Sequence, residues 1–268
     1  MKIKTVPIGG DRLVQICNED WGLEWQLQFP EVVMSDGRSI MAWPLNCRPD
    51  WKPLGSGGWC YHWRASEEYI EEVRSMGLVD TNGVRQHVHF VRGVTLYAEI
   101  VPGDGMVDLT VSLTNETDED VKSVYCDGGC FQARNEAFIG NDEVMRSFVR
   151  TDGKMKSMGL VHRTVAIRSM YCHSEDWYDG KDEWFWGRSG VAIDSPAIVG
   201  AVSVDRSMAL VFGYEQSYSA LANSDEHHCL HSRPLFGDLM PGETVTRCGK
   251  VIFGSDIVHL GDRLAAEL

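Results

Sequence analysis

The sequence has no long hydrophobic run and a deficit of positive charge. No stretch of its 268 residues approaches the roughly 18 consecutive apolar residues of a membrane-spanning helix, so we expect no membrane partner. Residues 1–7 lack the apolar segment of a signal peptide, which predicts a cytoplasmic protein, or a periplasmic one if a leader was removed. The formal net charge of −14 argues against nucleic acid as a partner, because phosphate backbones attract basic surfaces.

The chain also lacks the common nucleotide-binding and zinc-ribbon patterns. Neither G-x-G-x-x-G nor G-x-x-x-x-G-K-[ST] occurs, which argues against Rossmann and P-loop chemistry. Of the eight cysteines, Cys126 and Cys130 have a C-x3-C spacing, but no second close pair accompanies them. We therefore expect buried free thiols rather than a zinc ribbon, although the even count leaves disulfides open.

Helical periodicity is scarce in this sequence. The best candidate is residues 66–77, where Ser66 can cap the first turn and Gly77 can end the helix. Residues 255–268 form a second candidate, which Gly261 interrupts. One or two short helices are therefore expected.

Alternation of apolar and polar residues, which is typical of half-buried strands, dominates instead. The expected strands are residues 94–101, 107–114, 121–125, 160–168, 197–204, 208–213 and 245–253. Asp205-Arg206-Ser207 reads as a hairpin turn, and Pro241-Gly242 supplies the backbone angles of a type II turn. Many strands without βαβ alternation predict an all-β antiparallel sandwich, with residues 1–268 as a single domain.

Three segments carry candidate acid–base or charged groups. Arg85, His87 and His89 would share one face of a strand, and paired imidazoles suit proton transfer or metal ligation. Beyond the Gly128-Gly129 pair, Arg134 could bind a carboxylate or sulfate, unless this segment is only a structural bulge. The third set comprises His162, Tyr171 and His173. We expect these residues to act as general acid and base; the alternative is that they are polar residues at a sheet edge.

Two further segments indicate ligand binding. The first is a run of aromatic residues mixed with charged ones, which contains Trp177, Trp184 and Trp186. Its indole rings could stack on sugar faces; the alternative is that they pack into the core of the sandwich. The chain has nine Trp, which favours the sugar-binding interpretation. The second, residues 225–234, holds three His and a Cys, from which we select His231 and Arg233 as substrate-binding residues. No metal cofactor is predicted, although zinc at His87, His89 and His231 stays an open alternative.

The C-terminal region resembles a known family. Cys229-x-His231-x-x-Pro234, the Pro241-Gly242-Glu243 turn and the glycine-containing strand at residues 249–253 resemble one block of a poorly characterised bacterial β-sandwich family. The valine-rich strand at residues 107–114, followed by Asn-x-Thr, resembles a second block. The resemblance implies a galactose-mutarotase-like supersandwich and a role in polysaccharide degradation. The Asn-His strand motif of aldose mutarotases is missing from the sequence, which argues against mutarotase activity.

These features together predict a carbohydrate-active enzyme of the carbon–oxygen lyase or dehydratase type, acting on an oligosaccharide or a small uronate-containing sugar. A His or Tyr would remove the C5 proton of a uronic acid while Arg85 or Arg134 neutralises the carboxylate. A glycoside hydrolase remains an alternative, with its carboxylate pair drawn from Glu136, Asp176 and Glu183. A non-catalytic sugar-binding module and a metal-dependent enzyme are further alternatives, and homo-oligomerisation is left open.

Overall fold

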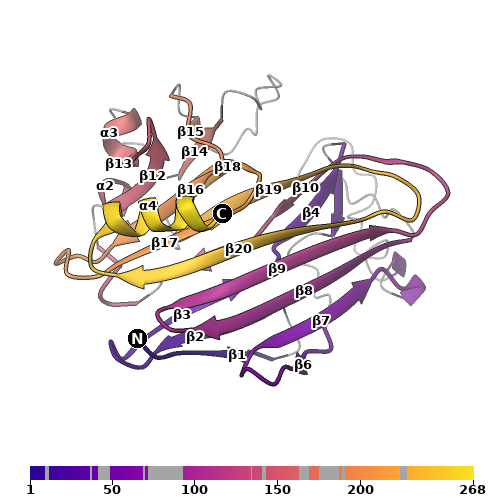
Figure 1. Cartoon of the computed structure of the whole chain (residues 1–268), viewed down its shortest axis with the longest axis horizontal. Helices are drawn as coiled ribbons and strands as arrows, with labels where there is room; N and C mark the ends of the chain where they lie inside the picture. Colours follow the sequence, from indigo (N-terminus) through magenta and orange to yellow (C-terminus); the bar gives the residue numbers. More distant parts are fainter. Residues whose placement is uncertain are drawn as a thin grey trace.

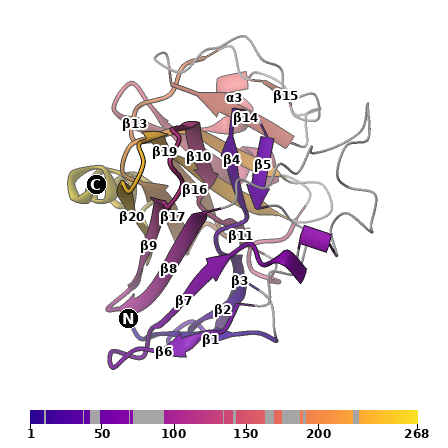
Figure 2. The same ribbon diagram turned by 90° about the vertical axis from the view of Figure 1, so that its right-hand side faces the viewer.

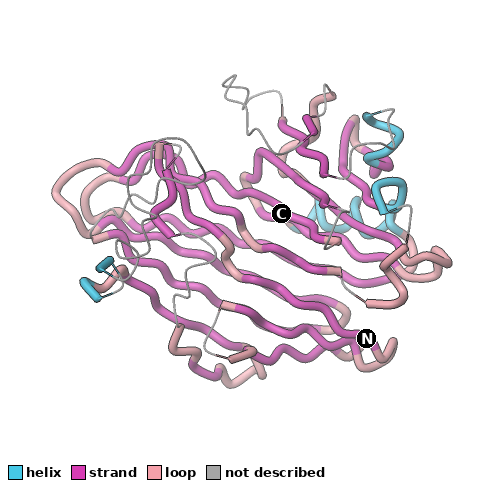
Figure 3. Tube along the Cα trace, turned by 180° about the vertical axis from the view of Figure 1, so that it is seen from behind, coloured by secondary structure: helices cyan, strands magenta, loops and turns pink. Residues whose placement is uncertain are grey.

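A computed structural model gives the fold of the chain. It describes residues 1–9, 12–36, 38–41, 49–68, 70–71, 93–133, 135–140, 143–162, 169–174, 187–188, 191–223 and 228–268. Within these residues strands are the main regular structure, and they form two packed sheets (Figure 3). No helix in the described part of the chain is both long and apolar enough to span a membrane.

The smaller sheet is antiparallel and has nine strands among the described residues. In spatial order they are β13 (Lys154–Ser157), β12 (Ser147–Thr151), β16 (Ile198–Val202), β17 (Ala209–Tyr214), β20 (Thr244–Gly254), β9 (Met106–Asn115), β8 (Val94–Gly103), β7 (Trp59–Arg64) and β6 (Lys52–Pro53). The neighbouring strands β20, β9, β8 and β7 run side by side across the front of Figure 1.

The larger sheet has eleven strands among the described residues. Its main path is β1 (Ile3–Pro7), β2 (Leu13–Asn18), β3 (Leu23–Gln28), β11 (Cys130–Gln132), β19 (Cys229–Leu239), β10 (Val121–Asp127), β4 (Val32–Ser35) and β5 (Arg38–Met41). The branch beside β19 is β18 (Ser217–Asn223), β14 (Ser169–His173) and β15 (Gly187–Arg188). Except for the parallel pair of β14 and β15, neighbouring strands are antiparallel.

The two sheets face each other across one apolar core, as the edge-on view in Figure 2 shows. Trp25 of the larger sheet packs against Phe253 of the smaller sheet, with ring centroids 5.0 Å apart. The prediction of an all-β antiparallel sandwich is therefore confirmed. Six of the expected strands correspond to β8, β9, β10, β16, β17 and β20. The expected turn at residues 205–207 joins the antiparallel strands β16 and β17, and the expected turn at Pro241-Gly242 leads into β20. Gly242 has the positive φ of +75° that a type II turn requires.

The expected strand at residues 160–168 is wrong for its described part. Residues Met158–His162 form helix α3, which packs beside α2 (Glu143–Arg146), and residues 163–168 lie outside the described residues. Met158 and Val161 pack inward three positions apart while Leu160 is 66% exposed. That spacing of three suits a helical turn and not a strand.

The expected C-terminal helix is confirmed as α4 (Ile257–Glu267), which lies over β16 and β17 on the outer face of the smaller sheet (Figure 1). Gly261 does not interrupt it. A Cβ at this position would overlap the Met155 side chain of β13, so the glycine allows the helix to approach the sheet closely. Of the other expected helix, only Glu67, Glu68, Ile70 and Glu71 lie among the described helical residues.

The start of α4 depends on one side chain. Asp256 Oδ1 accepts hydrogen bonds from the backbone N–H groups of Val258 and His259, at 2.9 and 3.1 Å. We expect Asp256→Ala to lower the free energy of unfolding by about 1 kcal/mol, because two N–H groups lose their acceptor. Asp256→Asn is the matched control and should retain most of the stability, as urea denaturation would measure. Equal losses in both variants would contradict the capping role.

Candidate functional site

Two neighbouring strands of the larger sheet are interrupted at the same level. β10 and β11 both pair with the same strand β19, through Tyr125 with Leu235 and Phe131 with Leu230, and Gly128-Gly129 separates them. β3 and β4 lie beside β11 and β10 in the same way, separated by residues 29–31. Asp127 and Glu31 are placed at these two interruptions.

The Gly128-Gly129 segment contributes to the packing of the larger sheet. Gly128 N–H donates to Ser232 O at 3.1 Å, so the interrupted strand stays attached to β19. A Cβ on Gly128 would overlap the ring of Tyr214, whose hydroxyl donates to Gly128 O at 2.8 Å. The neighbouring candidate Arg134 lies outside the described residues.

β19 presents charged groups on one face and packs its other face on the core. Leu230 belongs to the core, and Ser232 Oγ donates to Ala197 O of the segment preceding β16. Because side chains alternate along a strand, Cys229, His231 and Arg233 occupy the opposite face. The cluster described below therefore lies on the outer face of the larger sheet.

His231 lies at the centre of a buried ion network. Its Nδ1 is 3.1 Å from Asp127 Oδ1 and 3.1 Å from Glu31 Oε2. Arg233 Nε donates to Asp127 Oδ2 at 3.2 Å. The side chains of His231 and Asp127 are only 7% and 8% exposed, so this network of charges is shielded from solvent.

The charges in this network stabilise one another. Burial acts to lower the pKa of His231, but the neighbouring charges, first that of Asp127, outweigh it and hold the pKa well above its ordinary value. Burial likewise acts to raise the pKa of Asp127, but His231 and Arg233 hold it below its ordinary value. An ionised carboxylate and an imidazolium are therefore the favoured states.

Arg12 of the segment before β2 positions the other carboxylate. Its buried guanidinium donates through Nη1 to Pro30 O at 2.9 Å and to Glu31 O at 2.7 Å. These bonds fix the chain where β3 ends and β4 begins, and so place the Glu31 side chain beside His231.

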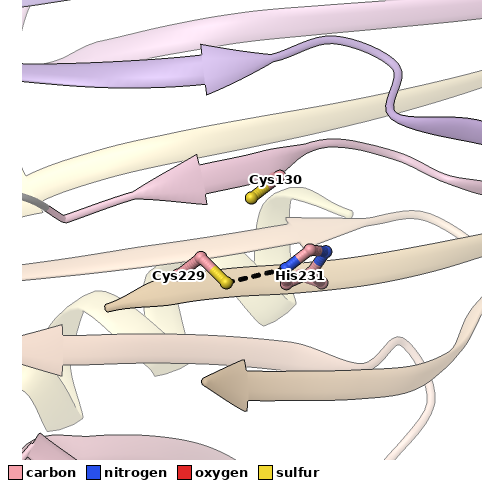
Figure 4. Close-up of side chains that lie close together, drawn as sticks. All are labelled: Cys130, Cys229 and His231. Carbon is pink, nitrogen blue, oxygen red and sulfur yellow. Dashed lines mark hydrogen bonds between the residues drawn. The ribbon is translucent and has the colours of Figure 1, made fainter. Parts of the chain in front are cut away.

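Two thiols lie on the other side of the same imidazole (Figure 4). Cys229 Sγ is 3.1 Å from His231 Nε2, and Cys130 of β11 lies close to both. The contact with Cys229, together with burial, holds the pKa of the Cys130 thiol well above its ordinary value. Cys126, which is close to Cys130 in sequence, instead packs in the core between the sheets.

Two other predicted residues fall in register with this cluster. Tyr171 of β14 pairs with Leu221 of β18, which pairs with His231. His173 pairs with Ser219, which pairs with Arg233. Two strand spacings separate the members of each row, which is about 10 Å between backbones. The buried Ser219 Oγ in the second row has no hydrogen-bond partner among the described residues.

The remaining predicted residues are not brought to this cluster by the described structure. His162 ends α3, which packs on β12 and β13 of the smaller sheet. The others lie outside the described residues: Arg85, His87, His89, Arg134, Trp177, Trp184 and Trp186. Two surface hollows of about 460 and 560 Å³ in the described part lie elsewhere, one beside Ser174 and Tyr218 and one beside Met155.

The comparisons with known proteins agree with this architecture. No protein-family model matches the chain, and no curated protein matches it in sequence. A galactose mutarotase-like protein from Lactobacillus casei superimposes with a TM-score of 0.54 at 9% identity, covering 94% of this chain and 100% of that one. The chain has the galactose mutarotase-like fold.

Other solved structures superimpose less well. A galactose mutarotase-like protein from Clostridium acetobutylicum has a TM-score of 0.48 at 11% identity, with 96% of this chain and 99% of that chain covered. A galactose mutarotase related enzyme from Lactobacillus acidophilus gives 0.48 at 9% identity, with the same coverage. The fold therefore rests on the superposition with the Lactobacillus casei protein, which at 9% identity establishes the fold alone.

Proposed function

We propose that the protein is a carbohydrate-active enzyme of the carbon–oxygen lyase or dehydratase type, with its reaction centre on the outer face of the larger sheet around His231. The observation that carries the proposal is the buried network of Glu31, Asp127, His231 and Arg233 in a galactose mutarotase-like fold. Burying charged groups costs desolvation free energy. A shielded cluster of charges on a sheet face therefore indicates a functional site.

The cationic groups supply the site for a uronate carboxylate. Arg233 and His231 lie two residues apart on β19 and are both held by Asp127. Positive charge placed against the carboxylate lowers the energy of the negative charge that develops when the adjacent C5 proton leaves. This gives both residues the substrate-binding role that their sequence positions predict.

Proton transfer is assigned to Tyr171 and His173, whose backbones lie in the same two rows as His231 and Arg233. One of them takes the C5 proton as general base, and the other donates a proton to the leaving oxygen on C4. The C5–H bond and the C4–O bond break, and a C4=C5 double bond forms. β18 lies between β14 and β19, so the backbones of Tyr171 and His173 are about 10 Å from those of His231 and Arg233.

The described carboxylates around His231 favour elimination over hydrolysis, while Asp176 and Glu183 lie outside the described residues. A glycosidase pair flanks the scissile bond, with one carboxyl on each side. Glu31 and Asp127 instead approach the same nitrogen of His231, and Asp127 also accepts a bond from Arg233. Their role here is to orient the two cations.

A screen of uronate-containing oligosaccharides tests the proposal, read by ultraviolet absorbance of the unsaturated product and by mass. We expect Arg233→Gln to lower kcat/KM by about 100-fold or more, because a fixed charge next to the reacting carboxylate is lost. The matched control is Arg150→Gln, since Arg150 pairs with Asp194 at 2.7 Å in the smaller sheet and should leave turnover unchanged.

The products separate the alternatives. Cleavage with one unsaturated end means lyase chemistry, and loss of one water means dehydration. A gain of water would overturn the proposal in favour of a hydrolase. Absence of turnover on every glycan, with glycan binding retained, would favour a non-catalytic module.

A further inference from the structure

We propose that Cys130, Cys229 and His231 form a zinc site, which goes beyond the proposed carbohydrate reaction and does not depend on it. The three side chains come from the neighbouring strands β11 and β19 (Figure 4). One ligand atom from each lies within 4.8 Å of the other two. Two sulfurs and one imidazole nitrogen are the donors that zinc prefers.

The distances need little adjustment to hold the ion. Zinc binds sulfur at about 2.3 Å and nitrogen at about 2.0–2.1 Å, which places a tetrahedral sulfur–nitrogen pair roughly 3.6 Å apart. Cys229 Sγ and His231 Nε2 are 3.1 Å apart. A small side-chain rotation therefore opens the position for a metal. Each thiol and the Nε2 of the imidazolium then give up a proton to solvent, and the two thiolates balance the charge of the zinc ion.

The opposite edge of the imidazole is arranged as in zinc proteins. A histidine that binds zinc through one nitrogen usually donates its other N–H to a carboxylate, which fixes the ring. His231 Nδ1 meets Asp127 Oδ1 and Glu31 Oε2, both at 3.1 Å, while Nε2 faces the thiols. The ring is therefore held in the orientation that directs Nε2 at the metal position.

A buried amide beside the thiols is the second observation. Gln28 of β3 pairs with Cys130 and is 4% exposed. Its Nε2 has no hydrogen-bond partner among the described residues. An unsatisfied buried N–H costs free energy and calls for a partner. A water bound at the fourth position of zinc would supply the acceptor.

The other buried thiols of the described chain provide the contrast. Cys126 and Cys172 pack within the apolar core between the sheets, as expected of cysteines that act as small apolar residues. Cys130 and Cys229 are equally buried but are grouped with an imidazole and carboxylates instead. Apolar packing explains why Cys126 and Cys172 are buried, but it does not explain why Cys130 and Cys229 are buried beside polar groups.

Cobalt substitution in the full-length chain tests the site without using a sugar substrate. We expect a single Co²⁺ per chain, with the charge-transfer absorption of thiolate ligation, and its displacement by Zn²⁺. Cys130→Ala and Cys229→Ala should each weaken Zn²⁺ binding by at least about 100-fold, and Asp127→Asn by about 10–100-fold. The control Cys126→Ala, which removes a buried thiol from the core, should bind zinc as the wild type does.

The wild-type spectrum is decisive even if a variant fails to fold. A folded wild-type chain that shows no thiolate-to-cobalt absorption at excess Co²⁺ would overturn the site. An absorption that survives in folded Cys130→Ala and Cys229→Ala would do the same. Because none of these readouts involves turnover, a failure here is distinguishable from a failure of the proposed lyase reaction.

Discussion

An Asp127→Ala protein is expected to lose about 3–5 kcal/mol of unfolding free energy, which is the usual cost of removing one partner from a buried ion network. Asp127 is 8% exposed and bonds both His231 and Arg233. Without it, His231 and Arg233 lose the carboxylate that they share, while Glu31 still approaches His231. Equilibrium unfolding in guanidinium chloride measures the change.

The control for this variant is Asp194→Ala. Asp194 pairs with Arg150, but the two side chains are 23% and 21% exposed, so solvent screens their interaction. The control should therefore lose only about 1 kcal/mol. If both variants lost the same amount, the carboxylate of Asp127 would not be the centre of a buried network.

Gly128→Ala is expected to destabilise the fold by about 2–3 kcal/mol through overpacking. The added Cβ would lie 2.7 Å from Tyr214 Cδ2 and 2.9 Å from Ser232 O, and the latter belongs to the backbone of β19 and cannot rotate away. Tyr214 is fully buried and also packs against Gly249, so its ring has no space to retreat. Urea denaturation gives the difference from wild type.

Gly55→Ala is the matched control, because no atom lies within 4 Å of a Cβ at Gly55 and its stability should stay near that of the wild type. The double variant Gly128→Ala, Tyr214→Leu should lose less than the sum of its single variants, since the smaller side chain relieves the overlap. Strict additivity would show that the two positions do not compete for the same space.

The strands that the sequence predicts either have one polar face or, like β16 and β17, form short apolar runs that are buried throughout. β9 alternates between buried and half-exposed positions along its whole length, and β8 does so up to Val101; this pattern is visible in the sequence. β19 was not predicted as a strand, because His231 and Arg233 occupy the face that in other strands contacts solvent, and Pro234 and Gly237 interrupt the pattern. Its strand character depends on pairing with the preceding strand β18 and with β10 and β11, and the last two are far away in the sequence.

The site was predictable only in part for the same reason. His231 and Arg233 stand out in a His-rich segment, but Asp127, Glu31 and Arg12 carry no local signal. Their importance comes from the coincidence of two strand interruptions, which only the sheet register reveals.

The cysteine spacing was misleading as well as uninformative. It directs attention to Cys126 and Cys130, which point to opposite faces of the sheet. The thiol that lies close to Cys130 is Cys229, which is 99 residues further along the chain. No rule of local spacing can find such a pair.

The positions of β19 and β20 constrain how the molecule assembles. β19 lies between β18 on one side and β10 and β11 on the other, and β20 lies between β17 and β9, so the last two strands are interior members of their sheets. Until these two strands have been synthesised, the earlier strands can form only separate parts of the sheets with open edges. Both sheets can therefore be completed only once β19 and β20 are available, which makes folding slow and leaves the nascent chain dependent on protection from aggregation.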